Sequence, residues 1–192
     1  MHGFLNLDKT KGISSAEAVR RIKKVIGPHK VGHGGTLDPI ATGILPIVIG
    51  NATRFSEEFL KMRKVYLATV TLGMSTDSYD SEGTSTFQAE ANQVSRINES
   101  LVSEALDQLI MSQRIESFDI DKPETQIMQK PPIFSALKKN GIAAHKLARK
   151  NKPINLDPRR VVIYSWKTGE VTRMIDGLRQ VVIEIECGRG FY

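Results

Sequence analysis

Cysteine is almost absent from this sequence of 192 residues, since Cys187 is the only one. A single cysteine excludes a disulfide within the chain, and with four histidines it cannot form a cysteine-rich zinc site. No run of apolar residues approaches the roughly 20 that span a membrane. The first residues, "MHGFLNLDKT", lack the basic stretch and the apolar core of a secretory signal. These absences favour a protein of the reducing cytoplasm with no membrane span.

The motifs of several widespread enzyme classes are missing as well. The chain has no G-x-x-x-x-G-K-[ST] sequence, which argues against a P-loop nucleotide site. Gly32-His33-Gly34 lacks the third glycine of the dinucleotide fingerprint, and no G-x-S-x-G hydrolase turn occurs. If the chain catalyses a reaction, these absences predict that side chains carry it without a cofactor or a metal.

The composition that is present is basic. Lys and Arg number 27 against 21 Asp and Glu, which gives a formal net charge of +6 and a pI near 9.5. Such a balance favours a polyanionic partner such as nucleic acid, although a solvated basic surface has the same composition. Basic residues gather in "KKVIGPHK", "KMRK" and "LKKNGIAAHKLARKNKPI". These clusters predict a surface that follows a phosphate backbone.

Hydrophobic periodicity predicts that strands and helices are interleaved along the chain. Strands are expected over residues 3–9, 44–50, 64–73, 159–168 and 178–187, and helices over 15–26, 52–62, 101–110 and 141–152. Ser14 stands three residues before Glu17, a capping-box pattern that marks a helix start. Asn51 is expected to cap the second helix. The polar segment 112–129 is expected to be a surface excursion.

This order of elements predicts one α+β domain over residues 1–192. The last two strands are separated by a turn that contains Asp176-Gly177, which predicts an antiparallel hairpin. We therefore expect a mixed, mainly antiparallel central sheet flanked by helices and loops.

The stretch "GHGGTLDPIATG", Gly32 to Gly43, concentrates turn residues around one carboxylate. Pro39 disfavours a helical conformation at Asp38, and Gly34 and Gly35 permit positive φ and a close approach by another backbone. A fixed, exposed carboxylate suits a nucleophile or a general base. A tight turn in which Asp38 accepts backbone hydrogen bonds explains the pattern equally well, and the local residues leave both open.

Several stretches resemble the TruB family of tRNA pseudouridine-55 synthases. "VGHGGTLDPIATGILPIVIG" is similar to the sequence around the family's essential aspartate, and "GFLNLDKTKGISS" to its first motif. "KVYLATVTLGMSTDSYDSEG" resembles the tyrosine strand with the acidic loop after it. "QKPPIFSALKKNGIAAHKLARK" and "IECGRGFY" are similar to later family segments. The resemblance covers nearly the whole chain and implies the pseudouridine synthase fold.

The resemblance also implies an activity and a site. The family converts a T-loop uridine of tRNA to pseudouridine by flipping the base and isomerising its glycosidic bond, with no cofactor. The catalytic residues that it implies are Asp38 as nucleophile, Tyr66 for stacking and proton transfer, and Asp80 in the active-site network. The substrate-binding residues that it implies are Lys9, His33, Gly34, Gly35, Tyr66 and Tyr192, with no metal. Taken alone, each of these residues has an ordinary structural explanation in a strand, turn or loop.

The partner implied is the T arm of tRNA. We expect a monomer, with no evident protein partner and no membrane. Two alternatives stay open: a guide-RNA-dependent relative that modifies ribosomal RNA, and an inactive tRNA-binding or tRNA-folding module. The sequence departs from the family at Thr10, which replaces a proline, and at His145, which replaces a tyrosine. The family's pocket arginine lies two residues beyond the tyrosine matched by Tyr192, outside this chain. We therefore expect a catalytic domain that is truncated at its C-terminus and lacks the RNA-binding extension.

Overall fold

The computed structural model describes residues 1–115, 124–133, 138–139, 142–143, 156–174 and 176–192. The chain forms two compact units, Met1–Met62 and Arg63–Tyr192. No helix among the described residues has the length and apolar character needed to cross a bilayer.

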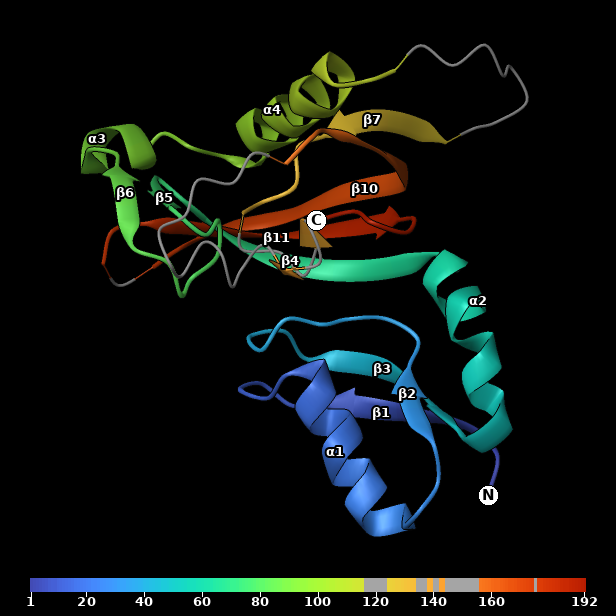
Figure 1. Cartoon of the computed structure of the whole chain (residues 1–192). Coiled ribbons are helices and arrows are strands. Elements are labelled where there is room, and N and C mark those ends of the chain that lie inside the picture. The colour runs from blue at the N-terminus through green and yellow to red at the C-terminus, as the bar shows by residue number, and fades with distance from the viewer. Residues whose placement is uncertain (116–123, 134–137, 140–141, 144–155, 175) are drawn as a thin grey trace. The chain divides into compact units, whose positions relative to one another are not determined.

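The first unit is built on a sheet of three antiparallel strands in the order β1-β3-β2. These are β1 (Gly3–Lys9), β3 (Gly43–Ile49) and β2 (Val31–His33). The apolar run predicted as a strand is β3, and its Leu45, Ile47 and Val48 are completely buried. Helix α1 (Ser15–Ile26) packs against the sheet through Ala18 (Figure 1). The core of this unit therefore lies between α1 and β3.

The ends of α1 agree with the sequence pattern. The Ser14 hydroxyl accepts a hydrogen bond from the Glu17 backbone N–H at 3.1 Å, which satisfies one free donor at the helix start. Gly27 follows the last residue with φ 81°, a conformation that glycine adopts without strain. The predicted start and end of this helix are confirmed.

The second helical segment differs from the expectation. It begins as a 3₁₀ helix, η1 (Gly50–Phe55), and continues as a short α-helix, α2 (Ser56–Lys61). Asn51 lies inside the 3₁₀ turn and makes no side-chain cap; its backbone N–H donates to His2 Nδ1 at 2.9 Å. The prediction that Asn51 caps this helix is therefore wrong. The chain leaves β3 directly into the turn, so the capping position falls on Ile49, which has no side-chain acceptor.

The second unit is built on a four-stranded antiparallel sheet in the order β4-β11-β10-β7. Its strands are β4 (Lys64–Leu72), β11 (Arg179–Cys187), β10 (Arg159–Arg173) and β7 (Thr125–Gln129). The predicted hairpin is confirmed as β10 and β11, and all strand pairings among the described residues are antiparallel. The α+β class with a mainly antiparallel sheet is confirmed.

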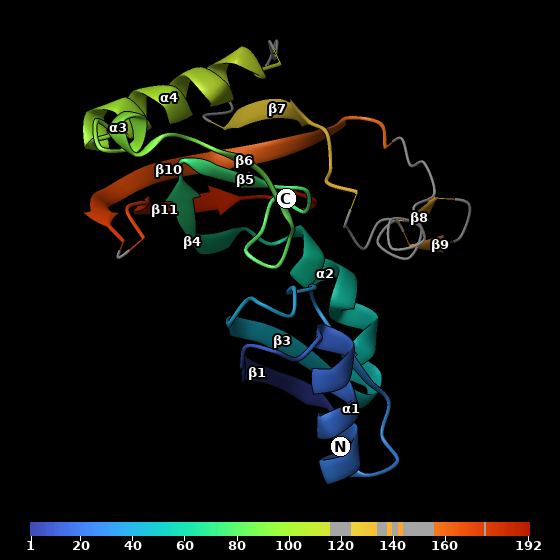
Figure 2. The same ribbon diagram turned by 90° about the vertical axis from the view of Figure 1, so that its left-hand side faces the viewer.

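Helix α4 (Glu99–Ser112) covers one face of this sheet (Figures 1 and 2). Val102 of α4 packs with Val171 and Val181 of the sheet. Ile110, near the other end of α4, packs with residues of β7 and β10. The Glu99 carboxylate also accepts a hydrogen bond from the Val171 N–H at 3.0 Å, and this bond lowers the pKa of Glu99. The helix predicted over residues 101–110 is confirmed, and the observed helix extends two residues farther at each end.

Shorter elements complete this unit. The polar loop after β4 begins with β5 (Met74–Thr76), which pairs with β6 (Ser85–Gln88) and leads to the one-turn helix α3 (Ala91–Val94). A two-residue pairing joins β8 (Lys138–Lys139) and β9 (Ile142–Ala143). The expected helix over 141–152 is contradicted at Ile142–Ala143, and all of its other residues lie outside the described part of the chain.

The segment expected to be least structured contains a strand. Residues 116–123 lie outside the described part, but Thr125–Gln129 form β7 at the edge of the sheet. The sequence "TQIMQ" has two adjacent apolar residues between polar ones and no alternation, and only Ile127 is buried, against Val161 and Ile163 of β10. Five residues with one strongly buried side chain give a weak sequence pattern, which is why charge in the surrounding residues hid the strand.

Candidate functional site

Asp38 lies on the loop that joins β2 to β3 in the first unit. Residues 36–38 have no regular secondary structure, a turn follows at Pro39 and Ile40, and Asp38 is exposed. The Asp38 carbonyl accepts a hydrogen bond from the Ala41 N–H at 3.1 Å. In the sheet, Lys9 is opposite Gly43, so the end of this loop meets the end of β1.

A turn between β1 and α1 bonds to this loop on the Pro39 side. The Gly12 N–H donates to the Pro39 carbonyl at 2.8 Å, and Lys9 Nζ donates to the same oxygen at 3.4 Å. Lys9 Nζ also donates to the carbonyls of Thr10 at 3.1 Å and Ile13 at 2.9 Å. Lys9 is 0% exposed. Its ammonium group therefore bonds to three backbone carbonyls inside the protein and is not exposed at the surface.

The start of α1 bonds to the loop on the Leu37 side of Asp38. Ser15 Oγ accepts a hydrogen bond from the Leu37 N–H at 2.9 Å and donates one to the Leu37 carbonyl at 3.0 Å. The Leu37 side chain packs against the core cluster of Ala18 and Leu45. The residues before and after Asp38 are thus fixed by hydrogen bonds from a separate segment.

The structure shows a packing requirement for glycine at one of the two glycines of the loop, Gly34. Neither Gly34 nor Gly35 has a positive φ. Gly34 is buried, and a Cβ added there would lie 2.4 Å from the Phe59 Cβ, so glycine is required by packing inside the protein. A Cβ at Gly35 would meet nothing within 4 Å. The close approach occurs at Gly34, but the neighbour is Phe59 of α2.

His33 is the last residue of β2, opposite Ile47. Its Nδ1 is buried and has no hydrogen-bond partner, the one such side-chain atom found in the described part of the chain. A buried polar atom without a partner costs roughly 1–3 kcal/mol, and such atoms gather where a ligand completes the bonding. The ring therefore has an unfilled hydrogen-bonding position close to the Asp38 loop in sequence.

Tyr66 and Tyr192 belong to the second unit. Tyr66 is near the start of β4, opposite Ile185, and is 37% exposed. Tyr192 is held through its backbone by Gln129: Gln129 Oε1 accepts from the Tyr192 N–H at 2.9 Å, while Gln129 Nε2 donates to the Tyr192 carbonyl. Both aromatic rings keep exposed surface, which stacking on a base requires.

Asp80 lies in the loop between β5 and β6. Its Oδ1 accepts hydrogen bonds from Ser78 Oγ at 2.6 Å and from the Glu82 N–H at 2.9 Å. Its backbone carbonyl accepts from Thr76 Oγ1 at 2.8 Å. In this structure Asp80 shapes its own loop, as the turn-forming interpretation of "DSYDSEG" predicts.

Cys187 is completely buried at the end of β11, and burial raises the pKa of its thiol to about 11. The thiol is therefore protonated at neutral pH and is a packed apolar group, which excludes it as a nucleophile. The described residues contain no group of three or more His, Cys, Asp or Glu that could hold a metal ion.

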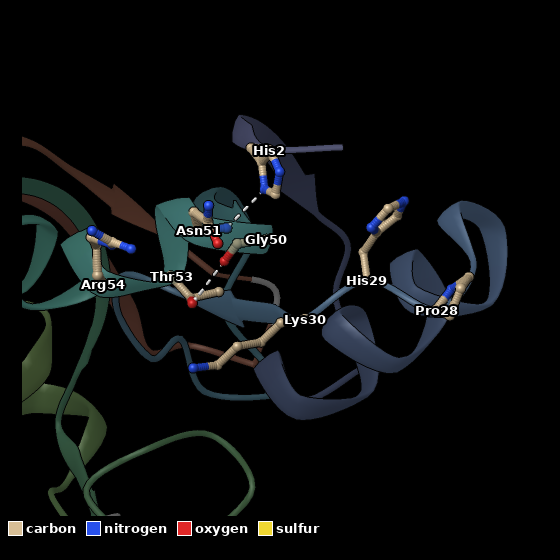
Figure 3. Close-up of a pocket in the computed structure, with 8 residues that line it drawn as sticks. All are labelled: His2, Pro28, His29, Lys30, Gly50, Asn51, Thr53 and Arg54. Carbon is tan, nitrogen blue, oxygen red and sulfur yellow. Dashed lines mark hydrogen bonds between the residues drawn. The ribbon is translucent and has the colours of Figure 1, made fainter.

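A basic pocket of about 400 Å³ lies elsewhere on the first unit (Figure 3). Its lining residues are His2, Pro28, His29, Lys30, Gly50, Asn51, Thr53 and Arg54. Gly3 pairs with Ile49 at this end of the sheet, whereas Lys9 pairs with Gly43 at the other. The seven-residue strand β1 thus separates the pocket from the Asp38 loop by roughly 20 Å.

The predicted residues divide between the two units. Lys9, His33, Gly34, Gly35 and Asp38 share the first unit, and Tyr66, Asp80 and Tyr192 belong to the second. Sequence analysis missed Ser15 and Gln129, which bond to the residues beside Asp38 and to Tyr192. The sequence does hold a signal for Ser15. Ser14 and Ser15 are adjacent, and because a helix start needs only one capping hydroxyl, the second serine is available for another contact.

Comparison with known proteins finds a family match over most of the chain. The family model described as "TruB family pseudouridylate synthase (N terminal domain)" matches residues 23–192. The chain is 37% identical over 192 residues to tRNA pseudouridine synthase B of Dehalococcoides mccartyi, covering 100% of this chain and 57% of that protein. It is 42% identical over 167 residues to tRNA pseudouridine synthase B of Aquifex aeolicus, covering 86% and 51%.

A solved structure supports the fold. The crystal structure of a Cbf5-Nop10-Gar1 complex contains a chain that matches with a TM-score of 0.59 and 26% identity, covering 99% of this chain and 40% of that one. The present chain thus spans little more than half the length of the curated relatives described above. On the match to 23–192, the chain belongs to the TruB family of pseudouridylate synthases.

Proposed function

We propose that the chain isomerises a uridine in the T arm of tRNA, at position 55, to pseudouridine. The observation that carries the proposal is Asp38: an exposed carboxylate whose neighbours Leu37 and Pro39 are both bonded to a separate segment. Membership of the TruB family supports it, as do the relatives named tRNA pseudouridine synthase B. We further propose that the chain acts as a monomer in the cytoplasm.

The reaction is an isomerisation that needs no external reagent. The bond between uracil N1 and the ribose C1′ breaks, the base turns, and a bond forms between C5 and C1′. The proton on C5 leaves to solvent, and N1 gains one. Asp38 is proposed as the nucleophile, toward the sugar or toward the base, and its fixed backbone keeps the carboxylate in the geometry of attack.

The target uridine must leave the folded T loop to reach Asp38. Tyr66 is proposed to stack on the flipped base and to assist proton transfer, and Tyr192 to line the same pocket. His33 is proposed to contact the RNA beside the flipped nucleotide, where its unpartnered Nδ1 would find a hydrogen bond. Asp80 is proposed to belong to the active-site network.

Basic residues supply the remaining attraction for RNA. Lys30 and Arg54 line the pocket on the first unit with two histidines, a composition that suits a backbone phosphate. Because counterions are released when phosphates are neutralised, tRNA affinity should fall steeply as salt rises.

The proposal is tested by tritium release from tRNA labelled at uracil C5. Wild type is expected to release tritium, and Asp38→Asn to lower the rate by at least about a thousandfold because the amide is a poor nucleophile. Binding of tRNA should persist in that variant. Asp157→Asn, which removes one exposed carboxylate from the second unit, is the matched control and should keep the wild-type rate.

The same assay separates the alternatives. Release from purified tRNA, with no other RNA or protein present, excludes a guide-dependent enzyme. Binding of tRNA by wild type without release would identify a binding or folding module instead. A wild-type rate in Asp38→Asn would remove Asp38 from the mechanism.

A further inference from the structure

Ser15 makes an unusual pair of bonds. One hydroxyl accepts from the N–H and donates to the carbonyl of the same residue, Leu37. A serine hydroxyl carries one donor and two acceptor lone pairs, so it can make both bonds at once. Ser15 is 2% exposed and is the first residue of α1, so the helix fixes the position of its Cβ.

These bonds act on Asp38 through the peptide plane. The Leu37 carbonyl and the Asp38 N–H belong to one planar peptide unit, which rotates as a rigid body. A bond from Ser15 Oγ to the Leu37 carbonyl therefore sets the plane from which Asp38 projects. On the far side, the Asp38 carbonyl is bonded by Ala41, and Pro39 has a ring that fixes its φ.

The neighbouring helix cap shows that Ser15 is not needed to start α1. Ser14 accepts the Glu17 N–H and so provides the side-chain cap of this helix without Ser15. The hydroxyl of Ser15 bonds to Leu37, 22 positions away in sequence. Its two bonds are therefore explained by the loop and not by the helix.

We propose that Ser15 is a positioning residue for Asp38, which holds the peptide plane before the carboxylate at the angle that turnover requires. This inference rests on the proposed function. A misplacement of about 1 Å in a catalytic group costs on the order of a hundredfold in rate. Ser15→Ala should therefore lower the single-turnover rate by about 10- to 100-fold while tRNA affinity stays unchanged.

The matched control is Ser14→Ala. It makes the same chemical change one residue earlier and removes a helix cap, at a cost of about 1 kcal/mol in stability. It touches no atom of the Asp38 loop, so its turnover should equal that of wild type. A merely structural role for Ser15 predicts instead that both variants lose stability and that neither changes the rate below its melting temperature.

A second pair of variants covers the case in which Ser15→Ala does not fold. Ser15→Thr keeps the hydroxyl, whereas Ser15→Val has nearly the same shape without it. Any strain from the added methyl group is shared, so the threonine variant should exceed the valine variant in rate by at least about tenfold. Equal rates in this pair, or a wild-type rate in Ser15→Ala, overturn the proposal.

Hydrogen exchange gives a test that needs no variant. In wild type, the Leu37 amide should exchange more slowly than the exposed Thr36 amide because Ser15 Oγ accepts its hydrogen. An unprotected Leu37 amide overturns the proposal even if the chain shows no turnover. Absence of tritium release from wild type would instead contradict the proposed function and leave this measurement valid.

Discussion

The chain presents an acidic residue on each of two loops, and the loops are held in opposite ways. The Leu37–Pro39 loop carries Asp38 and is bonded by Lys9, Gly12 and Ser15 from another segment. The Asp77–Gly83 loop carries Asp80 and is bonded from within: Ser78 Oγ and the Glu82 N–H both donate to the Asp80 carboxylate.

The difference lies in which groups hold each loop. In the Asp77–Gly83 loop, the Asp80 side chain accepts bonds that form the turn. Beside Asp38, a lysine, a serine and a backbone N–H from another segment bond to the loop backbone. A carboxylate that must react with a substrate benefits from the support beside Asp38, because bonds from another segment fix the backbone that carries it.

Lys9→Met should give the largest effect on stability and would break the external support of the Asp38 loop. Methionine fills a similar volume but leaves the carbonyls of Thr10, Ile13 and Pro39 without the ammonium donor. The free energy of unfolding should fall by about 2–3 kcal/mol. Urea unfolding measures it.

The control for this variant is Lys11→Met, on the same turn but exposed. It removes the same charge and should change stability by no more than about 0.5 kcal/mol. If the two variants are equally stable, the buried ammonium does not support the loop.

Sequence patterns predicted most of the first unit because its signals are local. The Ser14 cap, the glycine after α1 and the apolar run of β3 each act within a few residues. The bonds from Ser15 to Leu37 join positions 22 apart, and Gln129 and Tyr192 are 63 apart. No pattern in a single sequence reports such pairs.

Local sequence signals also predicted only part of the candidate site. Proline and glycine around Asp38 indicated a constrained carboxylate, but these local residues alone left an ordinary turn open as well. The expected part of Lys9 in binding substrate did not anticipate its burial, since a lysine near a strand end is usually exposed. Gly34 was expected to admit another backbone, whereas the contact with Phe59 depends on how α2 folds back.

Asp80→Ala should give a smaller effect and would break the internal support of the second loop. It removes the acceptor for Ser78 Oγ and the Glu82 N–H, at a cost of about 1–2 kcal/mol in stability because the loop is partly solvated. Glu82→Ala removes a charge from the same loop but leaves both bonds, so thermal unfolding should place it close to wild type. Equal melting temperatures for the two variants would contradict self-support by Asp80.

Tyr79→Gly should give the smallest effect, with the opposite sign. Tyr79 has φ 63°, the one positive φ of a non-glycine residue among those described, and it is 81% exposed. Glycine relieves the clash of Cβ with the backbone and has almost no packing to lose, so stability should rise by about 0.5–1 kcal/mol. Tyr79→Ala removes the ring but keeps Cβ, and should show no gain. Differential scanning calorimetry should therefore rank the glycine variant about 1–4 °C above wild type. If alanine stabilises as much as glycine, the ring and not the backbone carries the cost, and the turn in the Asp77–Gly83 loop is unstrained.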